Sequence, residues 1–484
     1  MVEQTLKEKT AKGLFWGGLN GGIQQILNVV FGVFLARLLS PVDYGLVGML
    51  GIFMGIATVL FDSGFGLALI NRKEIRHDDY NSVFWFSLSV GLICYVILFF
   101  SAPLIAIFFD RPELESLSRV LFLWFLIGST TVAPNALMLK KMMFKERAKI
   151  DICAMIVSGV VGVILAFKGF AYWGIVVQTV TNSLVGATLR WYYVPWHPNL
   201  TFKVTPLKEM YTFGVKVFFT NIFTQINANV FSVLLGRFYR PEQVGYYTQG
   251  NKWMNMGYSF IWNMIGGVSL PVLTEVASDV ERQQKVFRKI LRFVSFVSFP
   301  SMLGLAFVAP ELIVIGVSDK WLPCVPVMQL LCVWGAVAPI ANLYSHVLLS
   351  HGKSDLYLYN TVALGVLQLL IIISVLSLGI YYMVLAFVIV NILWLLVWHY
   401  FVAKQIQIRL VDVFKDIFPF FLLSVGALGI CDVLIQFLSV NNLYQLFILK
   451  ILIVFVLYIN MLYFLDVIIF KEILSLFKGR LINR

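Results

Sequence analysis

The chain has 484 residues, of which 60% are hydrophobic and 13% are charged, and its mean hydropathy is +0.86. These values lie well outside the range of soluble globular proteins, so lipid must surround most of the chain. The formal net charge of +12 comes from short basic clusters between long apolar runs, and no continuous basic domain is present. Such clusters mark membrane sidedness, and we expect no nucleic-acid partner.

No sequence motif for catalysis or metal binding stands out. The five cysteines are scattered and form no CxxC pair, which argues against a disulfide framework and against a metal site. No Walker A sequence, Rossmann glycine pattern or nucleophile elbow occurs, so ATP hydrolysis is not expected. His77, Asp78 and Asp79 stand together, and a metal or sugar-nucleotide site is the alternative to the favoured interpretation as ordinary loop charges. We therefore expect no catalytic residue, no metal and no cofactor.

Apolar runs long enough to cross a bilayer, about 20 residues at about 1.5 Å each, fill most of the sequence. The first follows Lys7, Lys9 and Lys12 and reaches Leu39 without a cleavage site, so it indicates an uncleaved helix. The predicted spans, in chain order, are 14–39, 45–70, 82–109, 116–139, 150–167, 171–193, 209–237, 246–273, 290–316, 325–349, 356–378, 380–402, 415–437 and 443–470. The predicted fold class is an all-α polytopic membrane protein of about fourteen transmembrane helices.

The distribution of Lys and Arg predicts the orientation of these helices. With the N-terminus inside, 27 of the 37 basic residues fall in inner segments and six fall in outer loops. The positive-inside rule then places both termini in the cytoplasm. All loops are short, so neither side of the membrane has room for a soluble catalytic domain.

An internal repeat divides the predicted helices into two sets of six. At an offset of 200 residues, nine of the 21 positions from 25 to 45 are identical to their partners, including Gln25 with Gln225 and Pro41 with Pro241. Both copies have the same topology, which indicates a parallel repeat about an axis along the membrane normal. We expect an N-terminal lobe at 1–200, a C-terminal lobe at 201–404, and two appended helices with a cytoplasmic tail at 405–484.

Two early segments carry a family resemblance. The run LARLLSPVDYG at 35–45 and the run DSGFGLALI at 62–70 resemble the opening of bacterial polysaccharide transporters of the Wzx type. These belong to the multidrug/oligosaccharidyl-lipid/polysaccharide exporter superfamily. The resemblance implies that two lobes alternate in access and move an undecaprenyl-pyrophosphate-linked oligosaccharide from the inner to the outer leaflet. It also implies a polysaccharide polymerase and glycosyltransferases in the same pathway.

Amides recur at four-residue spacing in the two repeat-related helices, the first and the seventh. They are Asn20, Gln24 and Asn28 in one helix and Asn221, Gln225 and Asn229 in the other. Residues at this spacing share one helix face, so both stripes are candidate linings of a cleft between the lobes. The alternative is that the amides hold helices together, as they commonly do in membranes.

Two lysines lie inside predicted helices, where a cation is costly and seldom without a purpose. Lys216 in the seventh helix and Lys252 in the eighth are each about 10 Å from a helix end. Either is a candidate partner for a phosphate, and snorkelling to nearby headgroups is the alternative. Lys216 projects nearly opposite Asn221, so both faces of the seventh helix cannot line one cavity.

Other polar residues in the membrane have mainly structural interpretations. Arg37 and Arg237 end the first and seventh helices, where a cation complements the helix dipole; a role in releasing diphosphate is the alternative. Asp62, near the inner surface, is a candidate coupling or gate residue for protons or sodium, and structural pairing is the alternative. His346, beside Asn342, is interpreted as a structural histidine rather than a proton relay.

The sequence thus favours a non-enzymatic flippase in the bacterial inner membrane. The substrate would be a lipid-linked oligosaccharide for surface polysaccharide: O-antigen, capsule or exopolysaccharide. A multidrug exporter of the same superfamily is the first alternative, although its cationic substrates call for acidic rather than basic residues in the membrane. A membrane-embedded glycosyltransferase or polymerase is the second, and it normally needs a sizeable outer loop. The sequence fixes neither the sugar nor a coupling ion.

Overall fold

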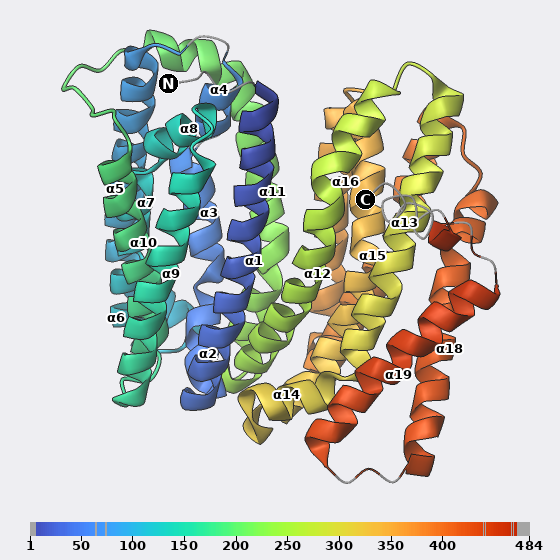
Figure 1. Cartoon of the computed structure of the whole chain (residues 1–484). Coiled ribbons are helices and arrows are strands. Elements are labelled where there is room, and N and C mark those ends of the chain that lie inside the picture. Colours follow the sequence, from blue (N-terminus) through green and yellow to red (C-terminus); the bar gives the residue numbers. More distant parts are fainter. Residues whose placement is uncertain are drawn as a thin grey trace. The chain divides into compact units, whose positions relative to one another are not determined.

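The computed structural model describes residues 6–62, 65–72, 75–438, 440, 442–465, 467 and 469–471, without the side chains of 6–14, 67, 71, 210–217, 219, 220 and 228. The regular elements within these ranges are all helices. By its internal contacts the chain forms two compact units, Met1–Gly245 and Tyr246–Arg484. Figure 1 colours the first from blue to green and the second from green to red.

The first unit is a helical bundle that ends with the first residues of α12. Its helices are α1 (Leu6–Leu38), α2 (Pro41–Met49), α3 (Gly51–Asp62), α4 (Phe65–Asn71), α5 (His77–Phe109), α6 (Glu113–Leu121), α7 (Leu123–Ser129), α8 (Val132–Lys140), α9 (Phe144–Phe167), α10 (Trp173–Tyr193) and α11 (Thr205–Phe238).

Three packing relations organise this bundle. Helices α9 and α10 form a tight hairpin, α1 lies against α9, and α11 packs against α2, α3, α4 and α5. Glycine makes the hairpin tight, because a Cβ on Gly162 would lie 3.1 Å from the carbonyl oxygen of Gly174. The seventh predicted helix, α11, therefore makes its contacts inside the first unit. The expected lobe boundary after residue 200 describes the sequence repeat and stays a prediction.

Three predicted spans are interrupted in the structure, so none of them is one continuous helix. The span 45–70 is divided into α2, α3 and α4, the span 116–139 into α6, α7 and α8, and the span 290–316 into α13 (Val280–Phe307) and α14 (Ala309–Val317). At the second break the hydroxyls of Thr130 and Thr131 donate to the carbonyls of Ile127 and Gly128, each at 2.7 Å. Hydroxyls that bond to the backbone of their own turn favour the end of a helix, and the axis bends there by 43°.

The start of α2 explains part of the repeated sequence. Ser40 caps the helix: its hydroxyl lies 3.3 Å from the Asp43 amide, and the Asp43 carboxylate accepts from the Ser40 amide at 2.8 Å. Pro41 then occupies the first helical position, where its missing N–H costs nothing. The repeat places a proline at the same point of α12 (Pro241–Glu275).

The second unit continues with α12 and contains the two appended helices. The others are α13 (Val280–Phe307), α14 (Ala309–Val317), the 3-10 turn η1 (Asp319–Cys324), α15 (Val325–Ser350), α16 (Ser354–Ser374), the turn η2 (Leu376–Leu378), α17 (Ile380–Ile406), α18 (Leu410–Leu438) and α19 (Leu443–Phe464). Helix α13 packs against α15 and α18, and α15 packs against α17.

Polar contacts attach the appended helices to this unit. Asp416 of α18 accepts from Arg288 and from Arg292 of α13, both at 2.6 Å. Lys450 of α19 pairs with Glu311 of α14 at 2.7 Å, and both side chains are almost fully buried. Each charge of this buried pair requires the other, because either charge alone would be costly. The helices α18 and α19 are thus integral to the second unit.

Within the described ranges, ten helices are long and apolar enough to cross a membrane, or eleven if the bent pair Glu113–Ser129 and Val132–Lys140 is one span. The chain is therefore a multi-pass membrane protein. Helices α10 and α12 have 21 and 35 residues, long enough to span, but they carry more polar side chains. Helix α11 has 34 residues, and several of its side chains lie outside the described residues. These three helices correspond to the sixth, seventh and eighth predicted spans, so the count of fourteen stays a prediction.

Candidate functional site

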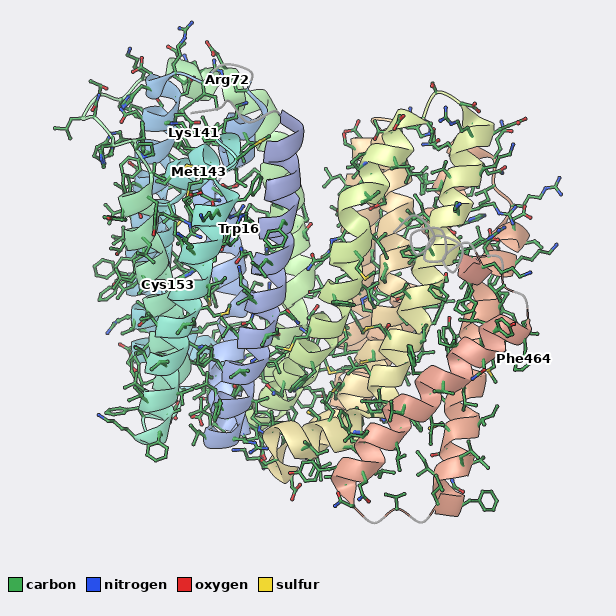
Figure 2. The ribbon with its side chains drawn as sticks, viewed as in Figure 1. Trp16, Arg72, Lys141, Met143, Cys153 and Phe464 are labelled. Carbon is green, nitrogen blue, oxygen red and sulfur yellow. The ribbon has the colours of Figure 1, made fainter. Side chains whose placement is uncertain are left out.

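An ion pair lies inside the α9–α10 hairpin. Nη2 of Arg190 in α10 is 2.6 Å from a carboxylate oxygen of Asp151 in α9, and the two side chains are 19% and 17% exposed. Arg147, one turn before Asp151, approaches the same carboxylate at 3.9 Å. In Figure 2, Cys153 marks this stretch of α9, two residues after Asp151. The hairpin thereby brings fixed charges into a membrane-spanning bundle.

These charges border a polar cavity of about 480 Å³, which is within the usual range of small-molecule sites. Helices α1, α3, α4, α7, α8, α9 and α10 contribute to its walls. Its polar lining consists of Gln24, Thr58, Asp62, Thr131, Asn135, Asp151, Asn182, Ser183 and Arg190. Apolar walls include Phe61 and Trp124, whose ring centroids are 6.1 Å apart. The cavity can hydrogen-bond a polar group inside an otherwise apolar bundle.

Helix α1 supplies part of this hydrogen-bonding network. The amide of Asn20 donates to Asp151 at 3.2 Å, and the amide of Gln24 donates to Asn20 at 2.9 Å. Gln24 therefore lines the cavity and Asn20 bonds to its wall, whereas Asn28, one turn beyond Gln24, is exposed. The contacts of Asn20 and Gln24 are with each other and with α9, within the first unit.

The cavity also presents a polar atom with unused bonding capacity. Oδ1 of Asn135 in α8 is buried and accepts no hydrogen bond from the described part of the chain. Asp62 ends α3 on the same cavity wall, and a Cβ on Gly66 would lie 2.5 Å from its carboxylate. A buried acceptor without a partner is costly, so a ligand that donates a hydrogen bond or carries positive charge would be favoured at Asn135.

The amide stripe of α11 lies against α3. The side-chain amide of Asn229 donates to the backbone carbonyl of Gln225 at 3.0 Å. A Cβ on Gly55 would lie 2.5 Å from Oε1 of Gln225, and one on Gly51 would lie 3.1 Å from Oδ1 of Asn229. Asn221, two turns before Asn229, is half-buried. The absence of side chains on two α3 glycines thus makes room for the α11 amides.

The remaining predicted site residues are not in this cavity. Arg37 and Arg237 are exposed at the ends of α1 and α11, and the Arg237 guanidinium lies 5.6 Å from the ring centroid of Phe108. Lys252 is half-buried on α12, in the second unit. The side chain of Lys216 lies outside the described residues. The proposed roles of these four cations in binding phosphate remain predictions.

The acidic residues at the start of α5 pair with cations. Asp78 lies 2.6 Å from Lys203, and Asp79 lies 2.8 Å from Arg72, which also contacts Glu209. In Figure 2, Arg72 lies at the same end of the first unit as Lys141 and Met143, beyond the end of α8. No group of three or more potential metal ligands occurs in the described ranges. Both aspartates lie in the first turn of α5 and Asp79 is buried, so their interpretation as ordinary loop charges is wrong.

Sequence reasoning missed Asp151, Arg190 and Asn135 as site residues. It counted Arg190 among the inner loop cations and gave no role to the other two. A signal was present, because residues 151 and 190 are nearly equidistant from the turn at 168–172 and so face each other in an antiparallel hairpin. Opposite charges at facing positions predict an ion pair. Nothing in the sequence singles out Asn135, whose environment depends on the break before α8.

Comparison with known proteins agrees with this architecture. The family described as "Polysaccharide biosynthesis protein" matches residues 34–326. The chain is 26% identical over 437 residues to the teichuronic acid biosynthesis protein TuaB of Bacillus subtilis (strain 168), covering 88% of this chain and 89% of that protein. It is 25% identical over 358 residues to the lipopolysaccharide biosynthesis protein WzxC of Escherichia coli (strain K12), covering 73% and 72%.

A solved structure shows the same fold. The lipid II flippase MurJ, in an inward closed conformation, superposes with a TM-score of 0.74 at 17% identity, covering 94% of this chain and 100% of that chain. The fold and the polar cavity thus define a multi-pass membrane protein of the MurJ fold. Because the family match covers more than half of the sequence, the chain belongs to the polysaccharide biosynthesis protein family. The Wzx-type resemblance seen in the first ninety residues is confirmed.

Proposed function

We propose that this protein is a flippase for an undecaprenyl-pyrophosphate-linked oligosaccharide in the bacterial inner membrane. It moves the repeat unit from the inner to the outer leaflet by alternating access, and the unit is then used for a surface polysaccharide. Both termini are cytoplasmic, and the chain itself performs no chemical reaction. Glycosyltransferases supply its substrate and a polymerase consumes the product.

The polar cavity of the first unit is the observation that best supports this proposal. A sugar cannot cross the hydrocarbon region without hydrogen-bonding partners, and amides, hydroxyls and a compensated ion pair provide them. The cavity of about 480 Å³ is suited to a small polar group, so the long lipid tail would remain in the bilayer. The names of TuaB and WzxC, which are a teichuronic acid and a lipopolysaccharide biosynthesis protein, point to the same substrate class.

The acidic residues of the cavity suggest how transport is driven. Asp151 pairs with Arg190, and Asp62 lines the same cavity at the end of α3. We assign Asp62 as the residue that binds a proton or sodium ion during the cycle, and we assign phosphate recognition to Lys216, Lys252, Arg37 and Arg237. These roles rest on the chemistry of the side chains.

Depletion of the protein in its host tests the proposal. Cells without it should lose surface polysaccharide and accumulate the lipid-linked oligosaccharide in the inner leaflet, where non-permeant periodate cannot oxidise it in intact spheroplasts. Repressing and restoring expression in the same strain provides the control. Unchanged surface polysaccharide, or accumulated precursor that periodate oxidises readily, would reject the flippase assignment. Hypersensitivity to cationic drugs with normal polysaccharide would favour a multidrug exporter.

A further inference from the structure

One face of α12, in the second unit, combines aromatic rings with amides near the middle of the helix. Asn251, Asn255, Tyr258 and Trp262 follow one another at spacings of four, three and four residues, which places them on the same side of the helix. Tyr258 and Trp262 lie about 17 and 21 residues from the start of α12 at Pro241, or roughly 25 and 31 Å along its axis.

The two rings, called here the aromatic platform, lie parallel to each other. Their planes differ by 7° and their centroids are 6.5 Å apart, so Tyr258 and Trp262 stack along the helix, one turn apart. Glycine at position 266 makes room for the indole, because a Cβ there would lie 2.7 Å from the Trp262 ring. The aromatic faces carry partial negative charge, which attracts the polarised C–H groups of a sugar ring.

Helix α15 holds this platform with hydrogen bonds. The amide of Asn342 donates to the Tyr258 hydroxyl at 2.6 Å, which occupies one acceptor position and leaves that hydroxyl its own proton to donate. His346 lies 5.4 Å from the Trp262 ring, and its Nδ1 is 2.7 Å from the hydroxyl of Ser269. The rings therefore sit among groups that can bond to hydroxyls, in a fixed orientation.

The exposed side chains of α12 show that this side of the helix does not face lipid. Asn255, on the same side as Tyr258 and Trp262, is exposed, and an amide exposed to hydrocarbon is costly. The other side carries exposed Phe260, Met264 and Val268, as lipid requires. Helix α12 is 35 residues long but too polar to count as a simple apolar span. Its polar side must therefore meet water or a polar ligand.

We propose that Tyr258 and Trp262, held by Asn342 and His346, form a carbohydrate-binding subsite that contacts a pyranose ring of the transported oligosaccharide. This inference rests on the proposed function and adds to it the residues that recognise sugar. Stacking against two aligned rings contributes affinity, and the Tyr258 hydroxyl with the neighbouring amides contributes specificity. The subsite recognises the sugar and not the pyrophosphate or the lipid tail.

Binding of two probes to the purified full-length protein in nanodiscs tests this subsite. One probe is the lipid-linked oligosaccharide extracted from depleted cells, and the other is undecaprenyl pyrophosphate without sugar. Trp262→Leu should weaken binding of the first probe about tenfold and leave binding of the second unchanged, whereas Trp262→Phe should retain most of the affinity. Phe260→Leu, which removes an exposed ring from the opposite side of α12, is the matched control.

Equal loss for both probes, or no loss for the first, would overturn the subsite. If the wild-type protein binds neither probe, the proposed function itself fails. A second measurement does not depend on removing a ring: a photo-crosslinking amino acid at exposed Asn255 should label the sugar, whereas one at exposed Phe260 should label only lipid. Labelling of the sugar from Phe260, or its absence from Asn255, would also reject the proposal.

Discussion

Asp151 and Arg190 illustrate how a charged pair persists in an apolar hairpin. Each side chain is less than one-fifth exposed, the contact is 2.6 Å, and Asn20 donates a further hydrogen bond to the carboxylate. A buried pair of this kind adds little to stability, but removing one partner leaves an uncompensated charge. The pair is therefore better understood as a fixed polar wall of the cavity than as a source of stability.

A double-mutant cycle measures this dependence. Arg190→Leu should lower the free energy of unfolding by about 2 kcal/mol. This loss is smaller than the loss on breaking a fully buried ion pair, because the cavity admits water. Asp151→Asn combined with Arg190→Leu should recover more than half of that loss, since no charge is left unpaired. Thermal unfolding in detergent gives both values. Additive effects of the two single substitutions would show that the charges are not coupled.

Repeated sequence elements also meet in the fold. A Cβ on Gly45 would overlap the carbonyl of Pro241, and one on Gly245 would overlap the carbonyl of Pro41. Both contacts lie inside the first unit, where the starts of α2 and α12 approach backbone to backbone. Gly45 and Gly245 are partners in the repeat, as Pro41 and Pro241 are, and only glycine permits such a close approach of two backbones.

Gly45→Ala tests this contact. The added methyl group cannot fit against the Pro241 carbonyl without moving a helix start, so we expect a loss of at least about 2 kcal/mol and reduced polysaccharide export. Gly17→Ala is the control, because no heavy atom lies within 4 Å of a Cβ there. Export and stability equal to those of the wild type in Gly45→Ala would show that the two helix starts separate freely.

Most helices could be predicted from the sequence because lipid imposes long apolar runs, and most ends were placed within a few residues. The breaks in 45–70, 116–139 and 290–316 were missed. In 116–139, Thr130 and Thr131 act through side-chain bonds that hydropathy does not register. Of the predicted site residues, Gln24 and Asp62 line the cavity and Asn20 bonds to its wall. The partners from α8, α9 and α10 depend on helix packing, which one sequence does not display.

The sequence repeat and the internal contacts divide the whole chain at different places. The sequence repeats at 200 residues, whereas the contacts divide the chain after Gly245. The difference arises because α11, the seventh predicted span, packs on α2 to α5. The appended helices α18 and α19 are fixed to the second unit by Asp416 and Lys450. The first unit thus contains the polar cavity, and the second contains the aromatic platform with its neighbouring amides.

Reconstitution into vesicles shows whether this chain alone moves a lipid-linked oligosaccharide between leaflets. Purified protein is incorporated into vesicles that hold the undecaprenyl-pyrophosphate-linked oligosaccharide with a fluorescent label on the sugar, and dithionite then quenches label in the outer leaflet. Protein-free vesicles and vesicles with Asp62→Asn protein are the controls. We predict that wild-type protein makes the inner-leaflet label accessible over time, while protein-free vesicles keep it protected. If that label stays protected in vesicles with correctly folded wild-type protein, the chain does not move this substrate between leaflets.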